Sequence, residues 1–108
     1  MTKKKKTAKN PSTVARPLKN YYSNAVRSEA GPLLWISGQV AIDKAGKLVG
    51  EGDLRKQAVQ VLENIRAILS ESGAAMSDIV KVTVYVTDIR AFNDITDIRE
   101  KYFPEDGP

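Results

Sequence analysis

Apolar residues recur every three or four positions between Asp53 and Gly73, and this spacing predicts an amphipathic helix. Asp53 is suited to cap the start of the helix, and Gly73 is suited to end it. The charged side chains of the segment fall largely on the opposite face. We therefore expect one face to pack on a core and the other to face water, with the core face formed by Leu54, Ala58, Val61, Leu62, Ile65 and Leu69.

Between residues 79 and 87 apolar residues recur at every second position, and this alternation predicts a β-strand. One side carries valines and the other carries polar or aromatic side chains, so the second face is polar enough to line a cleft or to meet another subunit. The first side consists of Val80, Val82, Val84 and Val86, and the second of Lys81, Thr83, Tyr85 and Thr87.

Two shorter strands are predicted near the start of the chain. Residues 22–26 form the first, and the apolar run 33–36 after the turn signal Gly31-Pro32 forms the second, so we expect a hairpin. Residues 40–42 are expected to extend the sheet. Trp35 is interpreted as a core residue.

A second helix is predicted after the strand at 79–87. Asp88 can cap it and Pro104 ends it. Its inner face would carry Phe92, Ile95, Ile98 or Arg99, and Tyr102. The order of strands and helices indicates an α+β fold, yet no strand follows Phe103 to complete the sheet.

The composition of the chain limits the catalytic and metal-binding groups that it can use. The 108 residues fit one domain, and so small a domain gains from hiding apolar surface against a partner subunit. The chain has no cysteine and no histidine, which excludes disulfides, imidazole-based triads and most transition-metal sites. We expect no cofactor and no metal, so catalysis would rely on carboxylates, amines, hydroxyls, backbone amides or water.

The charge is divided unevenly. Residues 1–28 carry eight basic side chains and no acidic one, whereas residues 29–108 carry nine basic and thirteen acidic side chains. Residues 1–20 are therefore predicted to be a basic, flexible arm, and nucleic-acid binding by the folded part is not expected. No apolar run is long enough to cross a membrane and no secretory signal is evident, which favours a soluble, cytoplasmic protein.

Several segments in order resemble the RidA/YjgF family. They are Tyr22-Ser23-Asn24-Ala25-Val26, Leu34-Trp35-Ile36-Ser37-Gly38-Gln39, Gln57 through Asn64, Gly73, Asp78 through Asp88, and Tyr102-Phe103. The similarity spans residues 21–103. No single motif decides it, but coincidence is a poor explanation for so many segments at the right spacing.

The resemblance implies a chorismate-mutase-like α+β fold, with a mixed β-sheet and two helices packed on one face. It also implies a homotrimer with ligand clefts between subunits and no membrane partner. The implied activity is hydrolysis of reactive enamines or imines, such as 2-iminopropanoate, to 2-oxo acids and ammonia. Such hydrolysis needs a bound carboxylate, one placed water and a stabilised tetrahedral adduct, and none of these requires a metal, thiol or imidazole.

The resemblance also suggests site residues. Tyr22 matches a cleft tyrosine and Gly38 a cleft glycine, with Ser37 and Gln39 as companions. The alternatives are a half-buried strand tyrosine and a simple turn glycine. On the second helix the family usually carries Asn and then Tyr, where this chain has Thr96 and Arg99. Thr96 can still donate a hydrogen bond, and Arg99 can bind an anion or simply face solvent.

The family's carboxylate-binding arginine and water-positioning glutamate lie on strands that would follow Pro108. Residues 21–108 are thus expected to form a RidA/YjgF-like domain lacking those strands, either because the sequence is a fragment or because the site is completed otherwise. A non-catalytic ligand-binding or chaperone-like trimer, and RNA binding or cleavage through the lysine-rich arm, remain as alternatives. Asn64 is interpreted as a structural amide and Lys81 as a surface or interface lysine.

Overall fold

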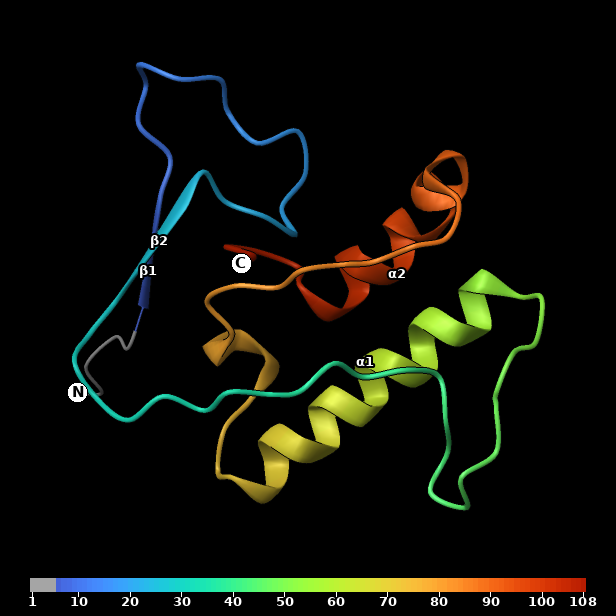
Figure 1. The fold of residues 1–108 in the computed structure, drawn as a ribbon. Helices are drawn as coiled ribbons and strands as arrows, with labels where there is room; N and C mark the ends of the chain where they lie inside the picture. The colour runs from blue at the N-terminus through green and yellow to red at the C-terminus, as the bar shows by residue number, and fades with distance from the viewer. Residues whose placement is uncertain (1–5) are drawn as a thin grey trace.

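The computed structural model describes residues 6–108, in which two short strands precede two helices (Figure 1). Short 3-10 helices, η1 and η2, occupy the connection between the two α-helices. The elements in order are β1 (Lys6–Lys9), β2 (Ala25–Ser28), α1 (Leu54–Glu71), η1 (Met76–Asp78), η2 (Ile89–Ile95) and α2 (Thr96–Tyr102).

The sheet consists of β1 and β2, which pair antiparallel with Lys6 opposite Ser28 and Lys9 opposite Ala25. β2 begins three residues later than the predicted strand at 22–26. The predicted hairpin with residues 33–36 is wrong, because β2 takes its backbone partner from the N-terminal side of the chain. Part of the segment expected to be a flexible arm, residues 6–9, is therefore a strand. Residues 1–5 of that arm lie outside the described residues.

Helix α1 begins and ends where its sequence indicates. The Asp53 carboxylate accepts a hydrogen bond from the Lys56 backbone amide at 3.1 Å, which satisfies one of the unpaired N–H groups of the first turn. Gly73 follows the helix with φ +74°, a conformation that glycine adopts without steric cost. The predicted apolar face is confirmed, since all six of its residues are half-buried or buried.

The second predicted helix is divided into η2 and α2. Asp88 caps η2 by accepting a hydrogen bond from the Arg90 backbone amide at 3.0 Å, as the sequence indicated, but the first turns are 3-10 rather than α-helical. The predicted inner face is retained, with Ile95, Ile98 and Tyr102 buried.

The core lies where α1 contacts η2 and α2. Ile36 and Val82, from two of the segments predicted to be strands, are partly buried against it. Its buried members are Leu69, Met76, Ile95, Ile98, Tyr102 and Phe103.

Residues 33–40 and 79–87 run extended in the same direction across Figure 1, yet neither is a strand. Val82 and Val86 are half-buried while residues 81, 83, 85 and 87 are exposed, so the predicted alternation is partly visible. Strand ladders require a second extended backbone at hydrogen-bonding distance. None of residues 6–108 supplies one to these segments. Residues 40–42 add only an isolated bridge between Ile42 and Leu48.

The core assignment of Trp35 is wrong for this chain, because the side chain is 85% exposed. The segment places Ile36 against the core, and the strand-like alternation turns Trp35 the other way. Within residues 6–108, no second layer covers that outer side.

None of the helices in the described part of the chain is both long enough and apolar enough to span a bilayer.

Candidate functional site

Tyr22 lies half-buried in the turn before β2. Its phenolic oxygen accepts a hydrogen bond from the Leu18 backbone amide at 3.0 Å. Its ring centroid is 5.7 Å from that of Tyr21. A phenol that accepts a hydrogen bond still has its own proton to donate, so Tyr22 keeps the donor that a ligand would need.

Arg99 is half-buried on α2 and contacts two aromatic rings. The guanidinium carbon lies 4.1 Å from the centroid of the Tyr21 ring and 4.7 Å from that of the Phe92 ring. Tyr21 comes from the turn before β2, while Phe92 comes from η2. Aromatic faces attract a guanidinium but accept none of its in-plane hydrogen bonds in the ordinary sense. The cation is thus held in place with its N–H groups still free.

Thr96 is the first residue of α2 and is half-buried. Residues three apart on a helix are neighbours, so Thr96 and Arg99 share a face. The contact between Arg99 and Phe92 shows that the arginine side chain extends toward the start of the helix, past the turn that holds Thr96. The ring of Tyr21 therefore links Tyr22 to Arg99, and Thr96 lies one turn from Arg99 on the same helix.

Residues 37–39 take no part in these contacts. Ser37 and Gly38 are exposed, and the Gln39 side-chain amide donates to the Ser37 carbonyl at 3.2 Å. A methyl group added at Gly38 would meet nothing within 4 Å, so packing within this chain does not require glycine there. No hydrogen bond or ring contact within residues 6–108 joins this segment to Tyr22, Thr96 or Arg99.

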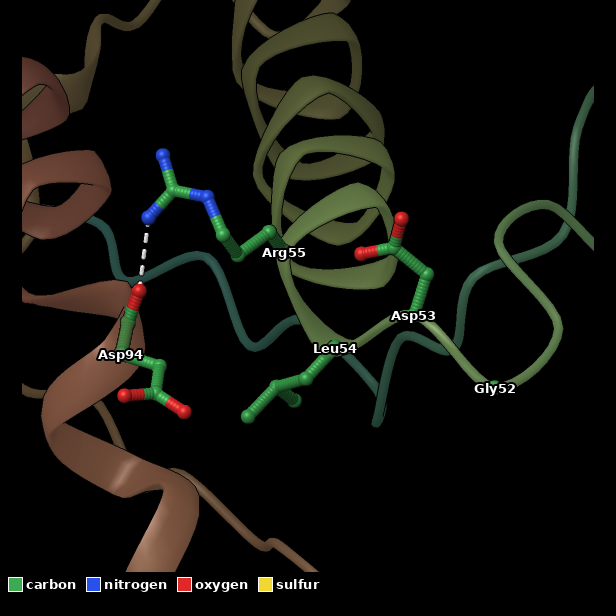
Figure 2. A pocket seen from close by; sticks show the side chains of 5 residues that line it. All are labelled: Gly52, Asp53, Leu54, Arg55 and Asp94. Atoms are coloured by element: carbon green, nitrogen blue, oxygen red, sulfur yellow. Dashed lines mark hydrogen bonds between the residues drawn. The ribbon is translucent and has the colours of Figure 1, made fainter.

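An open pocket of about 570 Å³ lies beside the start of α1 and is lined by residues 52–55 and Asp94 (Figure 2). Two of its three polar side chains have partners within the chain. Asp53 caps the helix, and the Arg55 guanidinium donates to the Asp94 backbone carbonyl at 2.6 Å. The pocket therefore offers a ligand few free donors, because Arg55, the one basic side chain in its lining, is already engaged.

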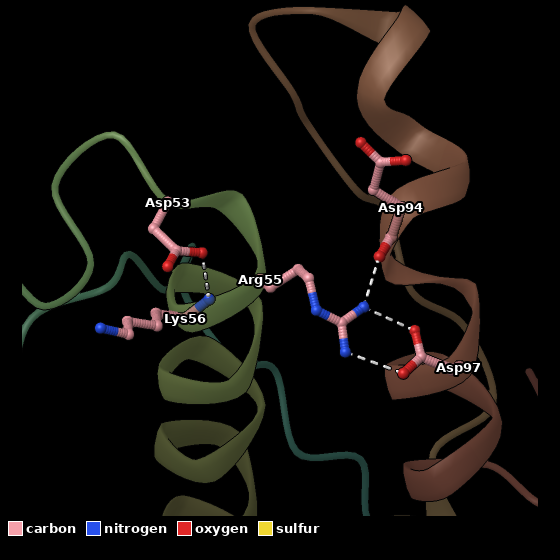
Figure 3. Close-up of polar contacts among 5 residues, drawn as sticks. All are labelled: Asp53, Arg55, Lys56, Asp94 and Asp97. Atoms are coloured by element: carbon pink, nitrogen blue, oxygen red, sulfur yellow. Dashed lines mark hydrogen bonds and ion pairs between the residues drawn. The ribbon is translucent and has the colours of Figure 1, made fainter.

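Arg55 also makes a two-pronged ion pair with Asp97 (Figure 3). Its two terminal nitrogens donate to the two carboxylate oxygens at 2.7 and 2.8 Å. The hydrogen bonds from Arg55 lower the pKa of the Asp97 carboxyl from 3.8 to about 2, and the same pairing raises the pKa of Arg55. The pair joins the first turns of α1 and α2, which is a structural role.

Lys6 is a partly buried amine, and amines of this kind can form imines when deprotonated. Burial lowers its pKa from 10.5, against the opposing influence of the Asp106 and Asp78 carboxylates. However, its ammonium donates to the backbone carbonyls of Ile79 at 2.8 Å and of Asp106 at 3.4 Å. These contacts use the protonated form, so Lys6 joins β1 to two distant segments.

The remaining polar residues singled out from the sequence have simple environments. Asn64 donates to the Val40 and Ile42 carbonyls at 3.3 and 3.0 Å, which confirms its interpretation as a structural amide. Lys81 is exposed.

Sequence reasoning missed the two rings beside Arg99. Phe92 was interpreted as core, although its spacing of four residues from Thr96 and seven from Arg99 places all three on one helical face. Tyr21 carried no such signal, because its contact with Arg99 depends on how distant parts of the chain pack.

Residues 13–108 match the protein family described as Endoribonuclease L-PSP. A RutC family protein from Aquifex aeolicus is 46% identical over 78% of this chain and 65% of its own length. A protein from Dermatophagoides farinae named 2-iminobutanoate/2-iminopropanoate deaminase is 32% identical over 81% of this chain and 66% of its own length. The chain thus spans about two thirds of the length of the curated relatives it matches.

Solved structures agree with the sequence matches. A protein of the conserved Rid family from Yersinia pestis is similar with a TM-score of 0.82 and 29% identity, over 97% of this chain and 80% of the other. This likeness confirms the predicted α+β fold class, although the sheet within residues 6–108 has two strands.

Proposed function

Because the chain belongs to the Endoribonuclease L-PSP family, which includes the RidA/YjgF proteins, we propose that it hydrolyses reactive imines or enamines of amino-acid origin. The products would be a 2-oxo acid and ammonia. The observation that carries this proposal is the 32% identity to a protein named 2-iminobutanoate/2-iminopropanoate deaminase. We propose the cytoplasm as its location.

The proposed reaction needs no group that the composition lacks. An enamine first takes up a proton at carbon to become the iminium form. Water then adds to the C=N carbon, and a proton passes from the added oxygen to the nitrogen. The hydroxyl of this tetrahedral adduct loses its proton to water as the carbon–nitrogen bond breaks, which releases ammonia and leaves the carbonyl. A protein accelerates these steps by placing the water and by stabilising the adduct.

Tyr22 and Thr96 are the residues to which we assign hydrogen bonds in this reaction. Both are half-buried and both carry a hydroxyl that can donate. The Thr96 side chain has no hydrogen-bond partner among residues 6–108, and the Tyr22 phenol uses only its acceptor. Each therefore has a proton to offer the adduct.

We propose that residues 37–39 join the site across a boundary between subunits of a homotrimer. The exposure of Ser37 and Gly38 supports this arrangement, as does the lack of any hydrogen bond from this segment to Tyr22 within residues 6–108. The large side chains nearby support a covering partner, since Trp35 is 85% and Tyr85 91% exposed. Sedimentation equilibrium tests the assembly: three copies are expected, and Trp35→Ser should weaken their association. A monomer at every concentration would contradict it.

The activity is tested by mixing the protein with a threonine dehydratase and following 2-oxobutanoate. The spontaneous hydrolysis of the imine sets the baseline, and the protein should accelerate the release. Thr96→Ala should lower the acceleration, while Thr87→Ala, which changes an exposed threonine outside this region, should not. No acceleration at stoichiometric protein would count decisively against imine hydrolysis.

Two other functions are distinguished by the same preparation. Binding of 2-oxobutanoate without any acceleration would favour a ligand-binding trimer. Cleavage of RNA is suggested by the description of the matching family and by the lysine-rich arm. The acidic balance of residues 29–108 argues against it. Replacing Lys3, Lys4 and Lys5 with glutamine should abolish any RNA affinity that depends on the arm.

A further inference from the structure

Arg99 lacks the carboxylate partner that the arginines of α1 and η2 have. Arg55 pairs with Asp97, Arg66 with Glu63 and Arg90 with Asp88. Within residues 6–108, Arg99 makes neither an ion pair nor a side-chain hydrogen bond, although it is half-buried. A half-buried cation normally gains a hydrogen-bonding acceptor when it leaves water, so its N–H groups favour an external anion.

The aromatic contacts fix the position of this cation. Tyr21 and Phe92 hold the guanidinium carbon at 4.1 and 4.7 Å from their centroids. A side chain already held against two rings loses little conformational freedom when it binds, which favours affinity. The guanidinium edge presents parallel N–H groups, and their spacing matches the two oxygens of a carboxylate. The rings also provide apolar surface for a small carbon chain beside it.

We infer that Arg99, positioned by Tyr21 and Phe92, binds the carboxylate of a small organic acid, with Thr96 one turn away as a second polar contact. Taken with the proposed function, on which the identity of the ligand rests, the acid is the 2-imino acid substrate and its 2-oxo acid product. Arg99 would then hold the carboxylate while the C=N carbon is directed toward Tyr22 and Thr96.

Lysine would not replace arginine at this position. An ammonium keeps the charge but lacks the planar fork and stacks less well on aromatic rings. Arg99→Lys therefore separates a general attraction for anions from the specific geometry. Arg99→Gln removes the charge altogether. Arg27 provides a matched control, because it is exposed on β2 and lacks an ion pair among residues 6–108.

The test measures binding of 2-oxobutanoate and of its neutral methyl ester to the full-length protein by calorimetry. The acid should bind and the ester should not. Arg99→Gln should weaken acid binding by about ten- to a hundred-fold, Arg99→Lys by less, and Arg27→Gln should leave it unchanged. Thermal unfolding of each variant checks that the fold is retained. If Arg99→Gln does not fold, equal binding by wild type and Arg99→Lys would overturn the inference.

The rate of 2-oxobutanoate release in the dehydratase assay distinguishes a failure of this inference from a failure of the proposed function. Acid binding that depends on Arg99 without any acceleration would retain the carboxylate site and reject imine hydrolysis. Acceleration with an unchanged KM in Arg99→Gln would retain imine hydrolysis and reject the role of Arg99. Equal binding of the acid and its ester would also reject that role.

Discussion

The Asp97 carboxylate accepts hydrogen bonds from both terminal nitrogens of the Arg55 guanidinium, so it joins the first turn of α2 to the first turn of α1. The Arg55 nitrogen that contacts the nearer oxygen also donates to the Asp94 backbone carbonyl (Figure 3). This arrangement engages both terminal nitrogens of Arg55, whereas Arg99 is a half-buried guanidinium without an anion among residues 6–108.

The Arg55–Asp97 pair predicts how stability responds to acid. The folded pKa of Asp97, about 2, lies below the ordinary value of 3.8. The contribution is therefore fully present above pH 3.8 and is lost as the pH falls through about 2. Carbon-detected NMR titration of the Asp97 carboxyl should show this low pKa. In Arg55→Gln the pKa should return toward 3.8, and an unchanged value would contradict the assignment.

The cap of α1 predicts a loss of stability in Asp53→Ala. The Asp53 carboxylate satisfies the Lys56 backbone amide, and removing such a cap costs about 1 kcal/mol. Chemical denaturation should show this decrease in the free energy of unfolding. Asp53→Asn keeps an acceptor at the same position and should retain most of it. Equal losses in the two variants would show that the hydrogen bond is not the cause.

We expect Gly107→Ala to destabilise the structure locally, around residue 107. A methyl group there would overlap the backbone of Tyr21. The Gly107 amide donates to the Asn20 carbonyl at 3.0 Å, and the Ser23 hydroxyl donates to the Gly107 carbonyl at 2.7 Å. The substitution should lower the free energy of local opening at residue 107 by about 1 kcal/mol or more, measured by amide hydrogen exchange.

Gly31→Ala is the control for this substitution, because a methyl group at Gly31 meets nothing within 4 Å. It should leave the exchange rate of residue 107 unchanged. Equal exchange in wild type and Gly107→Ala would show that the segment does not pack on Tyr21 in solution.

We expect Gly38→Ala to lower activity while leaving stability nearly unchanged. Since a methyl group at this position has open space within the chain, Gly38→Ala should change the free energy of unfolding by less than about 0.5 kcal/mol. If residues 37–39 approach the ligand across a subunit boundary, the methyl group should lower kcat/KM by about ten-fold or more. Unchanged kinetics would remove Gly38 from the proposed site.

Helix positions were predictable from sequence because their signals are local. The repeat of apolar residues, the Asp53 cap and the Gly73 stop define α1 without reference to the rest of the chain. The Asp88 cap did the same for η2, although the balance between 3-10 and α-helical turns there depended on packing. The apolar face of α1 also fixed where the core would lie.

Strand pairing was harder to predict, because alternation shows that a segment favours an extended backbone but not which backbone lies beside it. Residues 79–87 illustrate this difference, and the pairing of β2 with Lys6–Lys9 was missed for the same reason. Trp35 is exposed because residues 33–36 do not pair into the sheet within residues 6–108, although the sequence had predicted that they would.

The candidate site was predictable only in part. Thr96 and Arg99 were identified because they stand where the RidA/YjgF family carries Asn and Tyr on the second helix. The contact between Arg99 and the Tyr21 ring could not be predicted in the same way. It joins residues far apart in the sequence, and such a contact produces no repeating pattern of residue types.

The amide of Asn64 donates to the backbone carbonyls of Val40 and Ile42 in the place that a neighbouring strand would take. A helix side chain thereby holds a segment that no ladder secures within residues 6–108, and Gln60 in turn orients the amide by donating to its oxygen at 2.7 Å. Unwinding the middle of α1 would release this segment at the same moment. The two parts should therefore open as one cooperative unit, with matching exchange kinetics despite their different backbone conformations.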